Sequence, residues 1–170
     1  MRPARDPLAP IVTALARAGL SLAVAESLTA GALAARLAAV PGVSAVLRGG
    51  VVAYASDVKT SVLDVDAGLL DHGGPVQAEV AVQMARGAGL LLGADVALAT
   101  TGVAGPGPAD GHAAGTFHVA CARPGGVRTR TWLAAGTRAV VREAAVGAAL
   151  GLLVDVVGDV GADHSTGAAG

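Results

Sequence analysis

The chain has 170 residues, of which 53% are hydrophobic and 15% charged, and its formal net charge is −1. This composition predicts one folded domain with a sizeable core and excludes a disordered chain. Near-neutral charge argues against the broad basic surface that binds nucleic acid or anionic membranes, so we expect neither as a partner. A single cysteine, Cys121, excludes an internal disulfide and a multi-cysteine metal site.

No segment of the sequence resembles a membrane span. The longest apolar stretches, 87–94 and 144–154, end at Asp95 and Asp155, well short of the roughly 20 residues that a span requires. The basic N-terminus is interrupted by Asp6 and by prolines, unlike a secretory signal. With its lone cysteine, the chain is expected to be cytoplasmic.

The first elements in chain order are a helix, a strand and a second helix. Helical spacing covers residues 8–18, and Gly19 is placed to end that helix. Residues 21–25 are predicted to form a short apolar strand. A second helix is expected to open within 27–31 and to continue to about Val40, where Pro41-Gly42 ends it.

The middle of the chain repeats this alternation. Residues 51–54 are predicted to form a strand, and 57–63 a short helix followed by a polar loop that includes 72–75. Apolar residues at helical spacing predict a long helix over 76–92. The stretch 95–101 then has the composition of a buried strand.

The last third predicts a glycine-rich loop, a hairpin and a final helix. The loop covers 102–111, the strands cover 116–122 and 127–133, and Thr137 caps a helix that ends near Val157. The hairpin makes the sheet mixed. We expect one α/β domain over 1–157, a disordered tail over 158–170, and ligands at the loops that follow strand ends.

Three loops concentrate the polar residues, and the first runs from Ala25 to Gly31. Ser27 lies there at a strand-to-helix junction, where free backbone N–H groups can stabilise an oxyanion or bind phosphate. A nucleophilic serine is one interpretation. The alternative is an ordinary serine or threonine helix cap, with Glu26 as a surface charge.

The second loop contains Tyr54 and Lys59, which are the only tyrosine and the only lysine of the chain. Eleven of the twelve basic residues are arginine, which cannot act as a base, whereas a desolvated lysine can. A buried hydroxyl beside an amine that merely reaches solvent is the alternative. Ser56 and Lys59 form a Ser-x-x-Lys pair, but the chain has no asparagine for the Ser-Asp-Asn motif of penicillin-binding proteins. We therefore expect Ser56 to be a helix cap.

The third loop, Thr100 to Gly107, follows the predicted buried strand. Its glycines would let the backbone approach a ligand, although a purely structural turn explains them equally well. Their order, Gly-x-x-Gly-x-Gly, is not the dinucleotide fingerprint, and the sole lysine is not in a Walker loop. The four histidines show no metal-ligand spacing, so no metal is expected: His72, His112, His118 and His164.

Together these motifs resemble the CinA C-terminal domain family, whose stand-alone members include bacterial nicotinamide mononucleotide amidases. The similarity runs from about Ser21 to Val157. It rests on the following segments: Ala25-Glu26-Ser27-Leu28-Thr29-Ala30-Gly31, Gly49-Gly50-Val51-Val52-Ala53-Tyr54 with Lys59, Thr101-Gly102-Val103-Ala104-Gly105-Pro106-Gly107, Gly115-Thr116, and Gly136-Thr137-Arg138 with Arg142.

The resemblance implies a three-layer α/β/α domain that hydrolyses the carboxamide of nicotinamide mononucleotide, without metal or cofactor. Ser27 falls on the family's nucleophile, Lys59 on its general base and Tyr54 on its hydroxyl partner. The expected substrate-binding residues are Thr29, Ala30, Gly31, Thr101, Gly102, Gly105, Arg138 and Arg142. Backbone N–H groups near 29–31 are the expected oxyanion donors. Arg142, Arg138 and the glycine loop are the candidates for the nucleotide's phosphate.

Four positions depart from the family's usual pattern. Leu28 replaces a common Cys, Ala30 a Gly, Asp57 an Asn, and Gln77 a Ser. Because Ala30 and Asp57 neighbour the expected nucleophile and base, a catalytically silent nucleotide-binding or regulatory domain is the alternative function. The high apolar fraction also favours a homo-oligomer.

Overall fold

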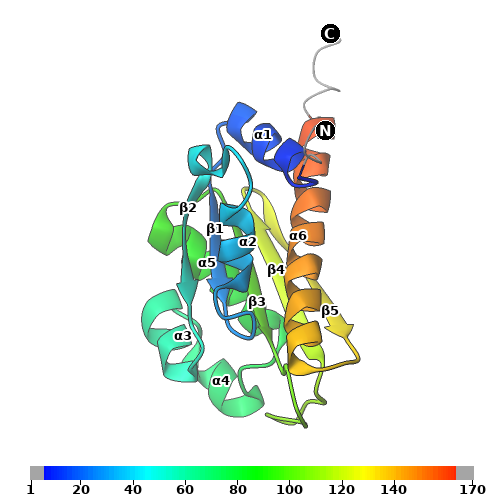
Figure 1. Cartoon of the computed structure of the whole chain (residues 1–170). Helices are drawn as coiled ribbons and strands as arrows, with labels where there is room; N and C mark the ends of the chain where they lie inside the picture. Colours follow the sequence, from blue (N-terminus) through cyan, green and yellow to red (C-terminus); the bar gives the residue numbers. More distant parts are fainter. Residues whose placement is uncertain (1–5, 164–170) are drawn as a thin grey trace.

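The protein, described for residues 6–163 by a computed structural model, is a single α/β/α domain (Figure 1). Its elements in chain order are α1 (Ala9–Arg17), β1 (Leu22–Glu26), α2 (Ala32–Ala38), η1 (Val43–Ala45), β2 (Leu47–Val52), α3 (Ser56–Leu63), α4 (Ala67–Gly73), α5 (Ala78–Leu92), β3 (Val96–Gly102), β4 (Thr116–Arg123), β5 (Gly126–Leu133) and α6 (Arg138–Asp163).

The five strands form one mixed sheet in the order β2-β1-β3-β4-β5. β1 pairs in parallel with both β2 and β3, while β3, β4 and β5 pair antiparallel. The mixed sheet and the hairpin are therefore confirmed. Since the chain leaves β1 for β2 on one side and reaches β3 on the other, the carboxyl ends of these strands form a switch point, where α/β sheets bind ligands.

Helices cover both faces of the sheet. α2 and α6 lie on the face toward the viewer in Figure 1, and α5 covers the opposite face. Strand residues on the α6 face are large and apolar, such as Leu22 and Leu98, whereas those on the α5 face are alanines. Small side chains let α5 pack closely. A Cβ at Gly87 of α5 would lie 2.0 Å from the carbonyl oxygen of Leu63, so glycine is required where α5 meets the end of α3.

Three predicted boundaries differ from the structure. The strand expected at 51–54 is β2 and spans Leu47–Val52, because Gly49 and Gly50 hide its apolar alternation. The polar stretch before α5 contains the short helix α4, which Asp66 caps by accepting a hydrogen bond from the Gly68 N–H. α6 continues to Asp163, beyond the predicted end near Val157. The rest of the expected tail, 164–170, lies outside the described residues.

The helix expected to open at 27–31 begins only at Ala32. Ala30 and Gly31 adopt left-handed backbone angles, with φ of 49° and 93°, which an α-helix cannot accommodate. Residues 28–31 therefore form a turn between β1 and α2. Glu26 is not a surface charge: it is 1% exposed, and its carboxylate accepts hydrogen bonds from the N–H groups of Gly31, Leu33 and Ala34.

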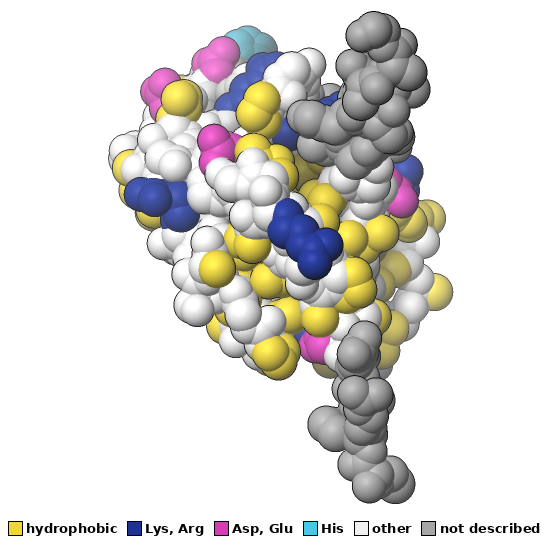
Figure 2. All heavy atoms as spheres, turned by 90° about the horizontal axis from the view of Figure 1, so that it is seen from above, with side chains coloured by type: hydrophobic (Ala, Val, Ile, Leu, Met, Phe, Trp, Pro, Cys, Tyr) yellow, Lys and Arg dark blue, Asp and Glu magenta, His cyan; other side chains and the backbone are white. Residues whose placement is uncertain are grey.

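Within residues 6–163, no helix combines the length and apolar character needed to cross a membrane. The same residues contain no group of three or more metal-ligating side chains. Figure 2 views the end of the molecule that carries α1, where the described basic side chains stand as separate groups among apolar and acidic ones.

Candidate active site

Three loops meet at the carboxyl end of the parallel strands. Parallel register aligns Glu26, the last residue of β1, with Val52 of β2 and Thr100 of β3. The Ser27 N–H donates to the Thr100 carbonyl at 2.9 Å, and the Ala53 N–H donates to the Glu26 carbonyl at 2.9 Å. These bonds continue the ladder past the strand ends, so the loops that carry the predicted nucleophile and base are held side by side.

Lys59 lies fully buried with its amine against Ser27. It belongs to α3, and its Nζ lies 3.1 Å from the Ser27 Oγ, 2.9 Å from the Ala53 carbonyl oxygen and 3.1 Å from the Tyr54 carbonyl oxygen. A neutral amine has two N–H donors and one lone pair. When the two carbonyls accept both protons, the lone pair faces the serine hydroxyl.

Burial lowers the pKa of Lys59 from its ordinary value of 10.5 to about 8. Desolvation disfavours the charged ammonium, and the negative charge of Asp110 opposes this by favouring it. The buried amine lacks a contacting carboxylate among its hydrogen-bond partners in the described chain. About a tenth of Lys59 is therefore neutral at pH 7, which gives a population able to act as a general base.

The turn that carries Ser27 is held from two sides. Glu26 binds the N–H groups at the start of α2, and the Thr29 hydroxyl lies 2.8 Å from that of Thr100. From α6, Arg142 donates to the Leu28 carbonyl at 3.0 Å and to the Thr29 carbonyl at 2.7 Å. Arg142 thus fixes the peptide groups next to the serine, and Glu26 fixes the start of α2 at the other end of the turn.

The expected oxyanion donors are largely unsuitable. The Ala30 N–H donates to the Ser27 carbonyl, and the Gly31 N–H donates to Glu26. Among the bonds of the described residues, the N–H groups of Leu28 and Thr29 have no acceptor. Of these, Leu28 directly follows the serine and lines the cavity described next.

A cavity of about 280 Å³ opens over Ser27 and Lys59. The expected site residues that line it are Ser27, Tyr54, Lys59, Thr101, Gly102, Gly105 and Arg138. Thr29, Ala30, Gly31 and Arg142 do not line it. Arg142 and residues 29–31 therefore lie outside the lining of this cavity, and the Arg142 guanidinium and the Thr29 hydroxyl contact neighbouring oxygens of the protein instead.

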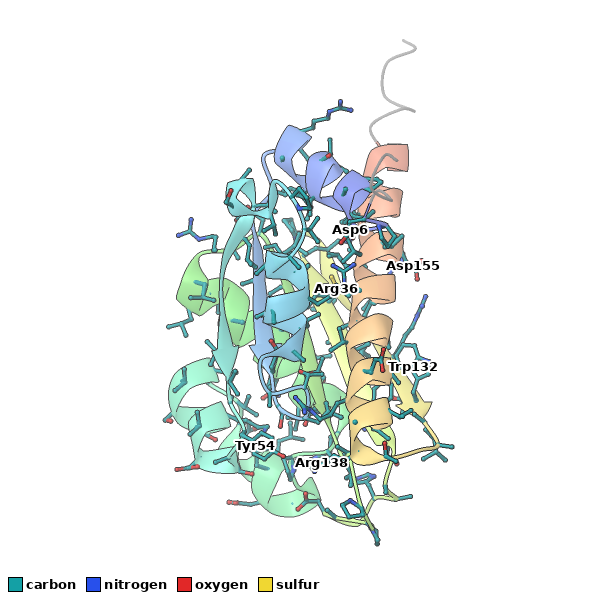
Figure 3. The ribbon with its side chains drawn as sticks, viewed as in Figure 1. Asp6, Arg36, Tyr54, Trp132, Arg138 and Asp155 are labelled. Carbon is teal, nitrogen blue, oxygen red and sulfur yellow. The ribbon has the colours of Figure 1, made fainter. Side chains whose placement is uncertain are left out.

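Tyr54 and Arg138 form one side of the cavity and approach each other at the lower end of Figure 3. Arg138 donates to the Tyr54 hydroxyl at 2.5 Å and to the Gly105 carbonyl at 2.9 Å. The Tyr54 side chain is 55% exposed, and only its main-chain carbonyl contacts Lys59. In this structure the Tyr54 hydroxyl, which was expected to be the partner of Lys59, contacts Arg138.

The third loop supplies a large part of the cavity lining, from Thr101 to Gly107. Thr101 donates its hydroxyl to the Pro75 carbonyl at 2.7 Å, which ties β3 to the segment before α5. A Cβ at Gly102 would lie 2.5 Å from the Phe117 Cβ, so this glycine is explained by strand packing as well as by the cavity. Ser56 is exposed at the start of α3 and makes no side-chain cap, so its expected role as a helix cap is wrong.

Sequence reasoning missed one cavity-lining residue of interest, Asp110, because it lies in a loop with no catalytic motif around it. It also missed the buried role of Glu26, for which the helix start six residues later, at Ala32, was the only signal. Of the histidines, His118 is buried in β4, where its Nδ1 lies 2.8 Å from the Thr131 hydroxyl. His164 lies outside the described residues.

The sequence profile of the CinA C-terminal domain matches residues 6–157, almost the whole described domain. The chain belongs to the CinA C-terminal domain family. A CinA-like protein of Frankia casuarinae is 49% identical over 139 residues, which are 82% of this chain and 32% of that protein. A putative competence-damage inducible protein of Shouchella clausii is 45% identical over 133 residues, or 78% and 32% of the two chains. The chain thus spans about a third of these relatives' length.

Solved structures of the CinA superfamily share the fold. A superfamily protein from Escherichia coli superposes with a TM-score of 0.84 at 34% identity, covering 87% of each chain. The competence/damage inducible protein CihA of Agrobacterium tumefaciens gives 0.81 at 36% identity, covering 86% of this chain and 90% of that one. The α/β fold with a mixed sheet is therefore that of the CinA family.

The structure shows where the four residues that depart from the family pattern lie. Ala30 occupies a left-handed turn position that favours glycine, and Asp57 lies exposed in the first turn of α3, where a carboxylate suits the helix dipole. Gln77 precedes α5 and donates to the carbonyls of Leu69 and Gly74. Of the four, Leu28 alone lines the cavity.

Proposed function

We propose that this CinA domain hydrolyses the carboxamide of nicotinamide mononucleotide to nicotinate mononucleotide and ammonia. The observation that carries the proposal is the buried Lys59 amine, 3.1 Å from the Ser27 hydroxyl at the floor of a cavity. An amide is a poor electrophile, and a serine needs an adjacent base to attack it. A lysine of lowered pKa provides that base.

In the first step, Lys59 takes the proton of Ser27 while the serine Oγ bonds to the amide carbon. The negative oxygen of the tetrahedral intermediate accepts a hydrogen bond from the Leu28 N–H, which has no acceptor within the described protein. One such donor is worth about 3 kcal/mol in the transition state. Lys59 then returns the proton to the departing nitrogen, so that ammonia leaves and an ester remains on Ser27.

Hydrolysis of the ester uses the same groups in reverse. Lys59 takes a proton from water, the hydroxide attacks the ester carbon, and Ser27 leaves with the proton that Lys59 returns. The serine hydroxyl and the lysine amine are restored, so one water is consumed for each ammonia released. No residue beyond the cavity is needed for the proton balance.

Arg138 is the group best placed for the phosphate of the nucleotide. It lies on the cavity wall at the N-terminus of α6, where the helix dipole also favours an anion. Among the residues that the structure describes, its guanidinium hydrogen-bonds neutral oxygens, those of Tyr54 and Gly105. A phosphate can replace these with two stronger, charge-assisted hydrogen bonds.

The alternative of a silent nucleotide-binding domain finds less support. Its motivation was the change of two residues beside the nucleophile and base, Ala30 and Asp57, and neither lines the cavity. The serine and lysine themselves are present and in hydrogen-bond contact. A domain that only binds nucleotides has no need for a buried amine that lacks a contacting carboxylate among the described residues, because such burial destabilises the protein.

Purified protein tests the proposal directly by release of ammonia from nicotinamide mononucleotide, with free nicotinamide as the control substrate. We expect turnover of the mononucleotide and little of free nicotinamide, which lacks the ribose and phosphate. Absence of ammonia from a folded preparation would reject the amidase, and equal rates on both compounds would remove the nucleotide from the proposal.

A further inference from the structure

Among the described residues that line the cavity, one is acidic: Asp110. The basic residues of the same lining are Lys59, at the floor, and Arg138, on the wall. If phosphate binds Arg138 and the carboxamide reaches Ser27, a negative charge on the remaining wall needs its own explanation. A carboxylate repels a phosphate, so Asp110 does not serve that part of a nucleotide.

Asp110 is held firmly by the local backbone. Ala109 and His112 exchange two hydrogen bonds, of 3.0 and 2.9 Å, around a two-residue turn made of Asp110 and Gly111. Both turn residues have positive φ, 50° and 75°, which is the geometry of a tight hairpin. The turn packs on the segment before α5, where a Cβ at Gly74 would lie 3.4 Å from the Asp110 Cβ.

The charge of Asp110 acts inside the cavity. It raises the pKa of Lys59 against the larger lowering by burial, so its field reaches the reacting groups. Asparagine suits the same turn as well as aspartate does, since both tolerate left-handed angles. Turn geometry therefore explains a short polar side chain at this position but not its charge.

We propose that Asp110 selects substrates whose carboxamide is carried on a positively charged ring, by pairing its carboxylate with that ring. The inference rests on the proposed function, because the pyridinium ring of nicotinamide mononucleotide is such a cation. With the carboxamide at Ser27 and the phosphate at Arg138, the ring lies within the same cavity that Asp110 lines. The anionic phosphate then faces Arg138, and the cationic ring faces Asp110.

The test compares two ligands that differ in ring charge. Nicotinamide mononucleotide has a cationic ring, whereas its reduced form has an uncharged dihydropyridine ring with the same carboxamide, ribose and phosphate. Binding is measured by calorimetry on a Ser27→Ala variant, which prevents turnover. We expect the oxidised form to bind more tightly, and Asp110→Asn to reduce this preference about fivefold, the scale of one partly exposed ion pair.

Asp57→Asn is the matched control, since it removes a carboxylate that is exposed on α3 and does not line the cavity. It should leave the preference unchanged. Equal weakening of both ligands by Asp110→Asn, or a preference that does not change, would overturn the inference while leaving the amidase intact. Selective binding with no ammonia released by the wild type would instead reject the proposed function alone, and failure of both ligands to bind would reject both.

Discussion

The pH dependence of turnover follows from the burial of Lys59. With a pKa of about 8, the amine is neutral in about a tenth of molecules at pH 7, half at pH 8 and nine tenths at pH 9. If neutral Lys59 is the base, kcat/KM for nicotinamide mononucleotide rises about fivefold from pH 7 to 8. It then rises less than about twofold from pH 8 to 9 and stays level to pH 10.

The assay is initial-rate ammonia release across this range, since kcat/KM reports the free enzyme. Lys59→Arg provides the matched variant: it keeps the positive charge but offers no lone pair to Ser27. We expect it to be as inactive as Lys59→Ala at every pH. A rate independent of pH from 7 to 10, a rate still rising steeply at pH 10, or an active arginine variant would each refute the base role.

Three further predictions concern Lys59 and residues around the pair that it forms with Ser27. Arg138→Ala should lower kcat/KM for the mononucleotide by about 10- to 100-fold but hardly change it for the phosphate-free riboside, because the lost bond is to phosphate. Arg142→Ala should lower kcat/KM for both substrates alike. If Arg142→Ala affected the mononucleotide selectively and Arg138→Ala affected both, Arg142 and not Arg138 would bind the phosphate. Ala30→Gly should raise the free energy of unfolding by about 1 kcal/mol in denaturant titrations, because φ at this position is 49°; an unchanged or lower value would contradict the strain. Lys59 binds a proton more weakly when folded, so stability should rise from pH 8 to 10.5 by up to about 3 kcal/mol relative to Lys59→Met; parallel pH curves for the two proteins would contradict its burial.

Hydrophobic periodicity was enough to predict most of the fold. The apolar runs that became β1 and β3 are uninterrupted, α5 has regular helical spacing, and the hairpin of β4 and β5 has a clear turn at Pro124-Gly125. The start of β2 was missed because glycines interrupt its pattern, and α4 because seven residues carry too little periodicity. The length of α6 was missed because glycine and aspartate near its end resemble a stop signal.

The pairing of Ser27 with Lys59 was expected from the resemblance to the CinA family and from Lys59 being the only lysine, and the order of the strands explains it. Ser27 and Lys59 are 32 residues apart, but each follows a strand, and parallel strands bring their carboxyl ends to one edge. The roles of the two arginines were harder to predict from the sequence, since Arg138 and Arg142 lie one helical turn apart on α6. Which of them faces the cavity and which faces the Leu28 carbonyl depends on how α6 packs, and spacing alone does not determine that.

Substitution of the serine tests the central claim most directly, with Ser56→Ala as the control at the other serine near Lys59. Both variants should keep the thermal midpoint of the wild type to within a few degrees, which shows that they fold. Ser27→Ala should lose more than about 10⁴-fold in ammonia release from nicotinamide mononucleotide, the scale for loss of a hydrolase nucleophile. Ser56→Ala should stay within about twofold, because that side chain is exposed on α3. An active Ser27→Ala protein, or loss of activity only in Ser56→Ala, would contradict the account.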